Sequence, residues 1–194
     1  MNLEQQAAEY IKKFEGYTSV AKWDVNAYRI GHGSDTIELL NGTHRKVVQG
    51  DSTTKALAQK DLERRLMIEF IPKIEKQIGA EYWKKIPQDA QVALLSLSYN
   101  YGSITKKSIL DAARSGDMTK LSKALVDSTY NDNQKLSVAM REALRDRRSE
   151  EASMISQAKE LVLKYPKISI GLVLVVVGLF GFAYAQYQYK IIKL

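Results

Sequence analysis

Residues 14–34 read FEGYTSVAKWDVNAYRIGHGS, and the hydrophobic pattern of the chain changes within this stretch. Before it, apolar side chains recur at helical spacing at Ala7, Ala8, Ile11 and Phe14. This spacing predicts an N-terminal helix over residues 4–14 that ends at Glu15-Gly16. After it, short runs of strand-forming residues and several glycines replace the helical period. The stretch therefore marks the passage from a helix into a small β-sheet.

The β region and the segments that follow it complete an α+β fold. Strands are predicted at residues 28–31, 36–39 and 46–48, with a tight turn at Asn41-Gly42. From Thr53 onward the pattern is helical, and Pro72 and Pro87 mark expected helix starts or breaks. The later helices are predicted at residues 88–99, 104–113, 118–126 and 136–164. The predicted domain thus has an N-terminal helix, a small β-sheet and a helical lobe.

The composition describes a folded chain with a basic surface. The chain has 194 residues, and 45% of them are hydrophobic, which favours a packed core over disorder. The formal net charge of +7 suits a polyanionic partner such as nucleic acid, anionic lipid or a bacterial wall. Cysteine is absent, which excludes thiolate metal sites. The only histidines are His32 and His44, which argues against a histidine-rich metal centre. We therefore expect no metal and no cofactor.

The C-terminal segment is long, apolar and uncharged. Residues 168–189 (Ile168 to Tyr189) contain no charged side chain, and Lys167 and Lys190 flank them. A helix of about 20 apolar residues crosses a hydrocarbon core of about 30 Å, so this segment is predicted to span a bilayer. The alternative is a buried helix of a soluble protein. The expected organisation is a domain at 1–155, a helical linker at 156–166, a transmembrane helix at 167–190 and a short basic tail at 191–194.

Two carboxylates are candidates for acid–base chemistry. Glu15 ends the first predicted helix, and Asp24 follows nine residues later beside Trp23. A glycosidase uses one protonated carboxyl group as an acid and one ionised carboxylate to steer water or stabilise the sugar cation. Apolar neighbours such as Phe14 and Trp23 are expected to favour the protonated form that the acid requires. Taken alone, the pair is also typical of solvated surface charges.

Three motifs in a fixed order resemble those of phage-type lysozymes, glycoside hydrolase family 24. Residues 14–34 resemble the active-site helix and β-hairpin of that family. Residues 91–102, QVALLSLSYNYG, resemble its helix that ends in Asn-x-Gly, and residues 146–152, DRRSEEA, resemble its closing Arg-Arg-x-x-Glu segment. Each motif alone is unspecific, but their order over residues 4–155 is specific.

The resemblance implies roles for individual residues. Glu15 takes the place of the general acid and Asp24 that of the second carboxylate. Arg29 occupies the place where the family usually has a threonine that holds the attacking water, and the loop after Asp24 is one residue shorter. An arginine there is expected either to pair with a catalytic carboxylate or to bind substrate. His32, Tyr99 and Asn100 are the further candidates for substrate binding.

The implied activity is hydrolysis of the β-1,4 bond between N-acetylmuramic acid and N-acetylglucosamine in peptidoglycan. The alternatives are a lytic transglycosylase that cuts the same bond, a non-catalytic wall-binding or structural membrane protein, and a nucleic-acid-binding protein. The last is disfavoured because no nucleic-acid motif accompanies the charge. The expected partners are peptidoglycan and a lipid bilayer.

The location is expected to be a membrane. Residues 1–6 have neither the basic nor the apolar region of a signal peptide, and basic residues are more frequent before the predicted span than after it. The positive-inside rule then predicts that the large domain lies on the cytoplasmic side, away from the wall. A host inner membrane that is later breached, or the internal membrane of a phage particle, would reconcile this with a wall substrate.

Overall fold

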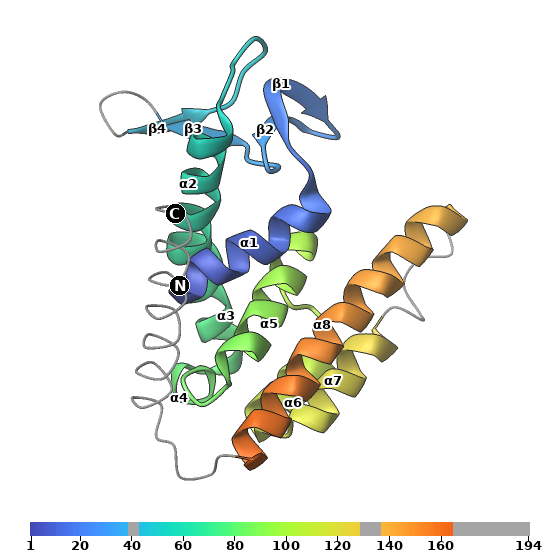
Figure 1. The fold of residues 1–194 in the computed structure, drawn as a ribbon. Helices are drawn as coiled ribbons and strands as arrows, with labels where there is room; N and C mark the ends of the chain where they lie inside the picture. The colour runs from blue at the N-terminus through green and yellow to red at the C-terminus, as the bar shows by residue number, and fades with distance from the viewer. Residues whose placement is uncertain (39–42, 129–136, 165–194) are drawn as a thin grey trace, which may run out of the picture. The chain divides into compact units, whose positions relative to one another are not determined.

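The computed structural model describes residues 1–38, 43–128 and 137–164 (Figure 1). The predicted turn at Asn41-Gly42 and the predicted transmembrane segment lie outside these ranges. Within them, no helix combines the length and the apolar character needed to cross a bilayer. Residues 1–159 form one compact unit and residues 160–194 are assigned to a second. The fold described below is that of the first unit.

The elements follow the order that the sequence predicts, a helix, then strands, then helices (Figure 1). They are α1 (Leu3–Glu15), β1 (Thr18–Asp24), β2 (Ala27–Gly31), β3 (Thr36–Glu38), β4 (His44–Lys46), α2 (Lys55–Arg65), the π-helix η1 (Leu66–Phe70), α3 (Ile71–Ile78), α4 (Ala80–Trp83), α5 (Gln88–Tyr101), α6 (Lys107–Ser115), α7 (Met118–Asp127) and α8 (Val138–Lys164). The predicted α+β architecture of N-terminal helix, small β region and helical lobe is therefore confirmed.

The β region differs in detail from the prediction. It consists of two separate antiparallel hairpins, β1–β2 and β3–β4, instead of one three-stranded meander. Strand β1 was not predicted, because its side chains do not alternate between buried and exposed positions. The last strand lies at His44–Lys46, two residues before the predicted one. The other edge of β1 is bonded to the loop before α2, where Ala21 donates to Asp51.

Helix α1 has defined ends that fix the position of Glu15. Asn2 and Gln5 form a reciprocal capping box at its start. Gly16 ends the helix with φ of 67°, a backbone angle that glycine adopts without strain. Ala7, Ala8 and Ile11 are fully buried on one face of α1. The last residue before the glycine, Glu15, is thereby held at the edge of the core.

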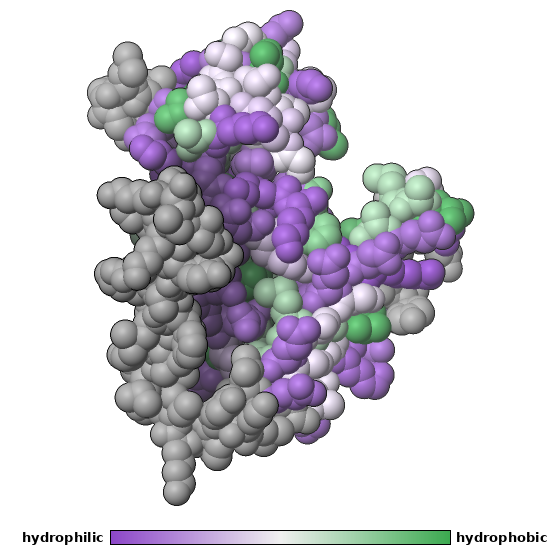
Figure 2. All heavy atoms as spheres, viewed as in Figure 1, coloured by the Kyte–Doolittle hydropathy of each residue, from purple (hydrophilic) through white to green (hydrophobic). Residues whose placement is uncertain are grey.

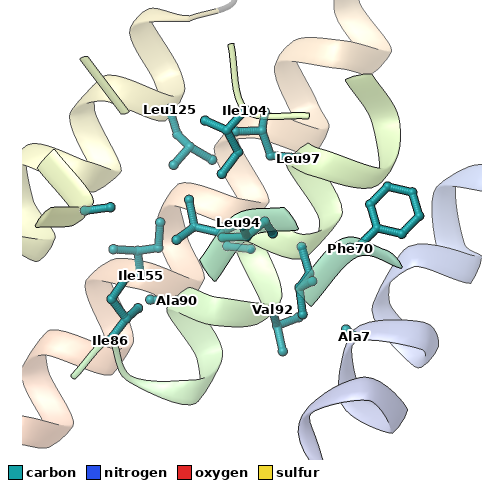
Figure 3. Close-up of a cluster of buried hydrophobic side chains, with 14 of the residues drawn as sticks. Ala7, Phe70, Ile86, Ala90, Val92, Leu94, Leu97, Ile104, Leu125 and Ile155 are labelled. Atoms are coloured by element: carbon teal, nitrogen blue, oxygen red, sulfur yellow. The ribbon is translucent and has the colours of Figure 1, made fainter. Parts of the chain in front are cut away.

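Helix α5 is the centre of the helical lobe. A continuous run from Val92 to Ser98 is buried, so this helix is covered on all sides. Figure 3 shows its side chains between Ala7 of α1 on one side and Ile155 of α8 on the other. Pro87 is the N-cap of α5 and Pro72 lies in the first turn of α3, so both mark helix starts as predicted. The helical path from α2 nevertheless continues through η1 into α3.

Candidate active site

Glu15 is held by a buried arginine from the other end of the domain. Its Oε1 accepts a hydrogen bond of 2.7 Å from Nη1 of Arg147 in α8, 132 residues along the chain. The Glu15 side chain is 22% exposed and that of Arg147 is 5% exposed. Figure 2 shows that the surface is hollowed between the β lobe and the N-terminal part of α8, and α1 ends beside this hollow in Figure 1.

Arg147 is itself fixed on every side. Its guanidinium donates to the backbone carbonyl of Ser96 at 3.1 Å and to the Ser96 hydroxyl at 3.0 Å. It lies over the ring of Phe14, 4.8 Å from the centroid, and its Nε is 3.4 Å from Oε1 of Glu151. A planar guanidinium with several donors is suited to this many simultaneous partners. The surroundings of Glu15 are therefore not purely apolar as predicted, because the Arg147 guanidinium bonds to its carboxylate and also stacks on the Phe14 ring.

Glu151 and Arg148 complete a buried network of charges. Glu151 is fully buried and accepts a short hydrogen bond from Nη1 of Arg148. Burial raises the pKa of Glu151 to about 7, although Arg148 and Arg147 act in the opposite direction. Nη2 of Arg148 also donates to the Asn100 side chain at 3.2 Å. The Asn100 oxygen predicted to contact substrate is thus bonded within the protein.

Asp24 lies at the exposed tip of the β1–β2 hairpin. Its side chain is 64% exposed, and its Oδ2 is 3.9 Å from Nε of Arg29. Because side chains alternate along a strand, Trp23 points to the opposite face of the hairpin, where its ring meets that of Tyr28 at 5.2 Å. Trp23 therefore does not shield Asp24, contrary to the prediction. Asp24 is the last residue of β1, whereas Glu15 is the last residue of α1, before β1 begins at Thr18.

His32 and Tyr99 are engaged in contacts between elements. His32 is 8% exposed, and its Nδ1 is bonded to the carbonyl oxygen of Gly16. The Tyr99 hydroxyl donates to the His32 carbonyl at 2.5 Å and accepts from Nη1 of Arg65 at 3.1 Å. Burial raises the pKa of Tyr99 to about 12. These contacts engage Nδ1 of His32 and the Tyr99 hydroxyl within the protein, and substrate binding by the two residues stays a prediction.

Besides Arg147, Arg148 and Glu151, the site contains Arg65 and Ser96, which were also not among the predicted candidates. Arg65, expected on the polar side of its helix, is only 8% exposed and stacks on the Tyr99 ring at 5.3 Å. Ser96 lies on the fully buried face of α5 and holds Arg147. The pattern of polar residues gave no signal for either, since both depend on contacts distant in sequence. Within the described ranges, no group of histidine, aspartate and glutamate side chains could hold a metal ion.

Comparison with known proteins identifies a family that includes the residues of this site. Residues 12–151 match the family model described as Phage lysozyme. The matched segment begins just before Glu15 and ends at Glu151, so it contains the whole charge network as well as both hairpins. A search of curated proteins returned no match.

Proposed function

The chain belongs to the phage lysozyme family, and from this premise we propose that it hydrolyses the β-1,4 bond between N-acetylmuramic acid and N-acetylglucosamine in peptidoglycan. The observation that carries the proposal is the placement of Glu15. It ends a rigid helix at the surface hollow, and Arg147, itself held by Ser96, fixes one oxygen of its carboxyl group. Such fixed geometry is what proton transfer to a bound substrate requires.

The two carboxylates have different roles in this mechanism. Oε1 of Glu15 is bonded to Arg147, so Oε2 is the oxygen that meets the substrate. From its protonated form Glu15 gives a proton to the oxygen of the leaving sugar as the glycosidic bond breaks. Water then adds to the anomeric carbon and loses a proton to solvent, and Glu15 takes up a proton from solvent to return to its protonated form. Asp24, at the exposed hairpin tip, steers that water or stabilises the positive charge on the sugar.

The second candidate function is a lytic transglycosylase. In that reaction the 6-hydroxyl group of muramic acid attacks the anomeric carbon in place of water, and an anhydro sugar results. The observation that favours it is the position of Arg29, which replaces the water-holding threonine of the family and lies 3.9 Å from Asp24. A third candidate, a wall-binding protein without activity, predicts that neither product forms.

Membrane attachment is a separate part of the proposal. Residues 167–190 are proposed to form a single-pass anchor, supported by the uncharged apolar run of residues 168–189 and the flanking lysines. The anchored protein would lie in the host inner membrane or in the internal membrane of a phage particle. Carbonate extraction of membranes that contain the full chain tests this proposal. Release into the soluble fraction contradicts it.

The activity is tested with the full chain in a mild detergent on purified peptidoglycan. We compare the wild type with Glu15→Gln and Asp24→Asn, and with Glu9→Gln as the matched control, since Glu9 is an exposed residue of α1 that pairs with Lys12. Mass spectrometry of the products separates the candidates. Reducing muramic ends that vanish with Glu15→Gln support hydrolysis, and anhydro ends support the transglycosylase. A folded wild type that releases nothing from several wall types excludes both enzymes.

A further inference from the structure

The turn that follows Glu15 differs from the left-handed glycine turns that end α5 and α6. Gly102 and Gly116 end their helices in the left-handed conformation, with ψ of −18° and 6°. Gly16 has ψ of −163°, so the chain leaves α1 in an extended direction immediately after Glu15. Because the chain leaves the helix at once, the backbone beside Glu15 needs another contact to hold it in place.

His32 supplies this contact. The Gly16 carbonyl can only accept a hydrogen bond, so the proton of the neutral imidazole must lie on Nδ1. The ring is buried and also meets that of Tyr17, with centroids 5.7 Å apart. The contact joins the end of α1 to the turn after β2, 16 residues later in the chain.

His32 is in turn fixed from the helical lobe. The Tyr99 hydroxyl of α5 donates to the His32 carbonyl, and Arg65 of α2 donates to the Tyr99 hydroxyl. Both Tyr99 and Arg65 are largely buried and stack on each other, which limits their motion. Hydrogen bonds therefore run from α2 through α5 and the hairpin to the residue that follows Glu15.

We propose that His32 is a positioning residue for Glu15, acting through the Nδ1–H hydrogen bond to the Gly16 carbonyl and held by Tyr99 and Arg65. This inference rests on the proposed lysozyme function for its consequence in catalysis. It is an alternative to the substrate-binding role expected from the sequence. Since an error of about 1 Å in the placement of a catalytic group can lower a rate about 100-fold, loss of the contact is expected to lower kcat and leave KM unchanged.

Two substitutions separate the two ring nitrogens. The amide nitrogen of asparagine occupies the place of Nδ1, whereas that of glutamine occupies the place of Nε2. His32→Asn is expected to retain most of the wild-type kcat, whereas His32→Gln and His32→Phe are expected to lose it. His44→Gln is the matched control, because His44 is exposed on β4. The opposite order, with His32→Gln active and His32→Asn impaired in KM, would show contact with substrate through Nε2 and overturn the proposal.

A second measurement does not depend on activity. The chain has two histidines, so nitrogen-15 spectra of the full chain in detergent can be assigned by comparison with His44→Gln. The proposal requires the neutral tautomer of His32 with the proton on Nδ1, and a weakened Nδ1–H signal in Tyr99→Phe. The other tautomer would overturn it. If the tautomer is as expected but the wild type cleaves no peptidoglycan, the contact stands and the proposed function fails.

Discussion

At the scale of single residues, Arg147 lies within ion-pair distance of both Glu15 and Glu151. At pH 8, above the pKa of Glu151 of about 7, replacing Arg147 by methionine leaves a fully buried carboxylate without one of its two cations and removes the bonds to Ser96. Breaking a buried ion pair costs about 3–5 kcal/mol, so we expect Arg147→Met to lower the free energy of unfolding by that amount and to abolish activity. Urea denaturation followed by circular dichroism measures the first effect.

The control for this prediction is an exposed pair of the same type. Lys107 and Asp111 are 2.5 Å apart on the surface of α6, and exposed pairs are worth only about 0.2–1 kcal/mol. Lys107→Met is therefore expected to change stability little. Arg147→Lys keeps the charge, but one ammonium cannot reach Glu15, Ser96 and Glu151 together. If Arg147→Lys were as active as the wild type, a positive charge at residue 147 would be sufficient for activity, and the hydrogen-bond geometry of the guanidinium would not be required.

Arg29 allows a prediction of modest size. It lies 3.9 Å from a carboxylate that is 64% exposed, and a pair of this kind is worth at most about 1 kcal/mol. If Arg29 acts by pairing with the Asp24 carboxylate, so that this carboxylate is less able to act on water or on the sugar cation, then Arg29→Thr should raise the rate of hydrolysis. Since about 1 kcal/mol corresponds to a factor of about five, the increase should be about fivefold or less. Reducing ends released per minute measure this rate. A fall in activity would instead indicate that Arg29 binds the substrate.

At the scale of elements, the β1–β2 hairpin is placed by a close approach to α2. Gly31 has φ of 63°, and a Cβ built there would lie 2.9 Å from Cβ of Ala58. Gly31→Ala therefore adds a clash to backbone strain of about 1–2 kcal/mol. We expect a larger loss of thermal stability than for Gly50→Ala, where φ is 89° and no atom lies within 4 Å of the added Cβ.

A double substitution tests whether the clash has the stated cause. Ala58→Gly removes the atom that the new Cβ would meet, at a cost of about 1 kcal/mol for glycine within a helix. In Gly31→Ala/Ala58→Gly the two losses should be less than additive. Additive losses, measured as changes in Tm, would mean that Gly31 is needed only for its backbone angle.

The elements also show which parts of the fold can be predicted from the sequence and which cannot. Helices were predicted well because apolar residues repeat along each one, as in α7, predicted at 118–126 and found at Met118–Asp127. Strand β1 carries no such period, and the π-helix η1 is a single widened turn within an otherwise helical path. The candidate Glu15 followed from a motif, whereas its partner Arg147 depends on packing between the two ends of the domain.

At the scale of the whole molecule, the charge network joins α1 to α8. Glu15 of α1, Ser96 of α5 and Glu151 of α8 all meet Arg147. The network also affects the buried Tyr10 of α1. Burial has the largest effect in raising the pKa of Tyr10, and the charge of Glu151 raises it further. Folding therefore brings these ionisable groups out of water together, and stability must depend on pH through the one that titrates near neutrality.

That group is Glu151, and the sign of its effect follows from its pKa. Burial raises the pKa to about 7 from an ordinary value of 4.5. Below pH 4.5 the carboxyl group is protonated in both the folded and the unfolded chain, and its contribution to stability is fully present. Between pH 4.5 and 7 only the unfolded chain releases the proton, so the free energy of unfolding falls as pH rises. A shift of this size corresponds to a loss of up to about 3 kcal/mol.

Urea denaturation at a series of pH values from 4.5 to 8 tests this prediction in wild type and Glu151→Gln. The glutamine is neutral at every pH and keeps an acceptor for Arg148, so its stability should lack the fall seen in the wild type. Glu150→Gln is the matched control, because Glu150 is the exposed neighbour on the same helix. If wild type and Glu151→Gln lose stability in parallel as pH rises, Glu151 is ionised throughout this range, and its charge is balanced by Arg147 and Arg148.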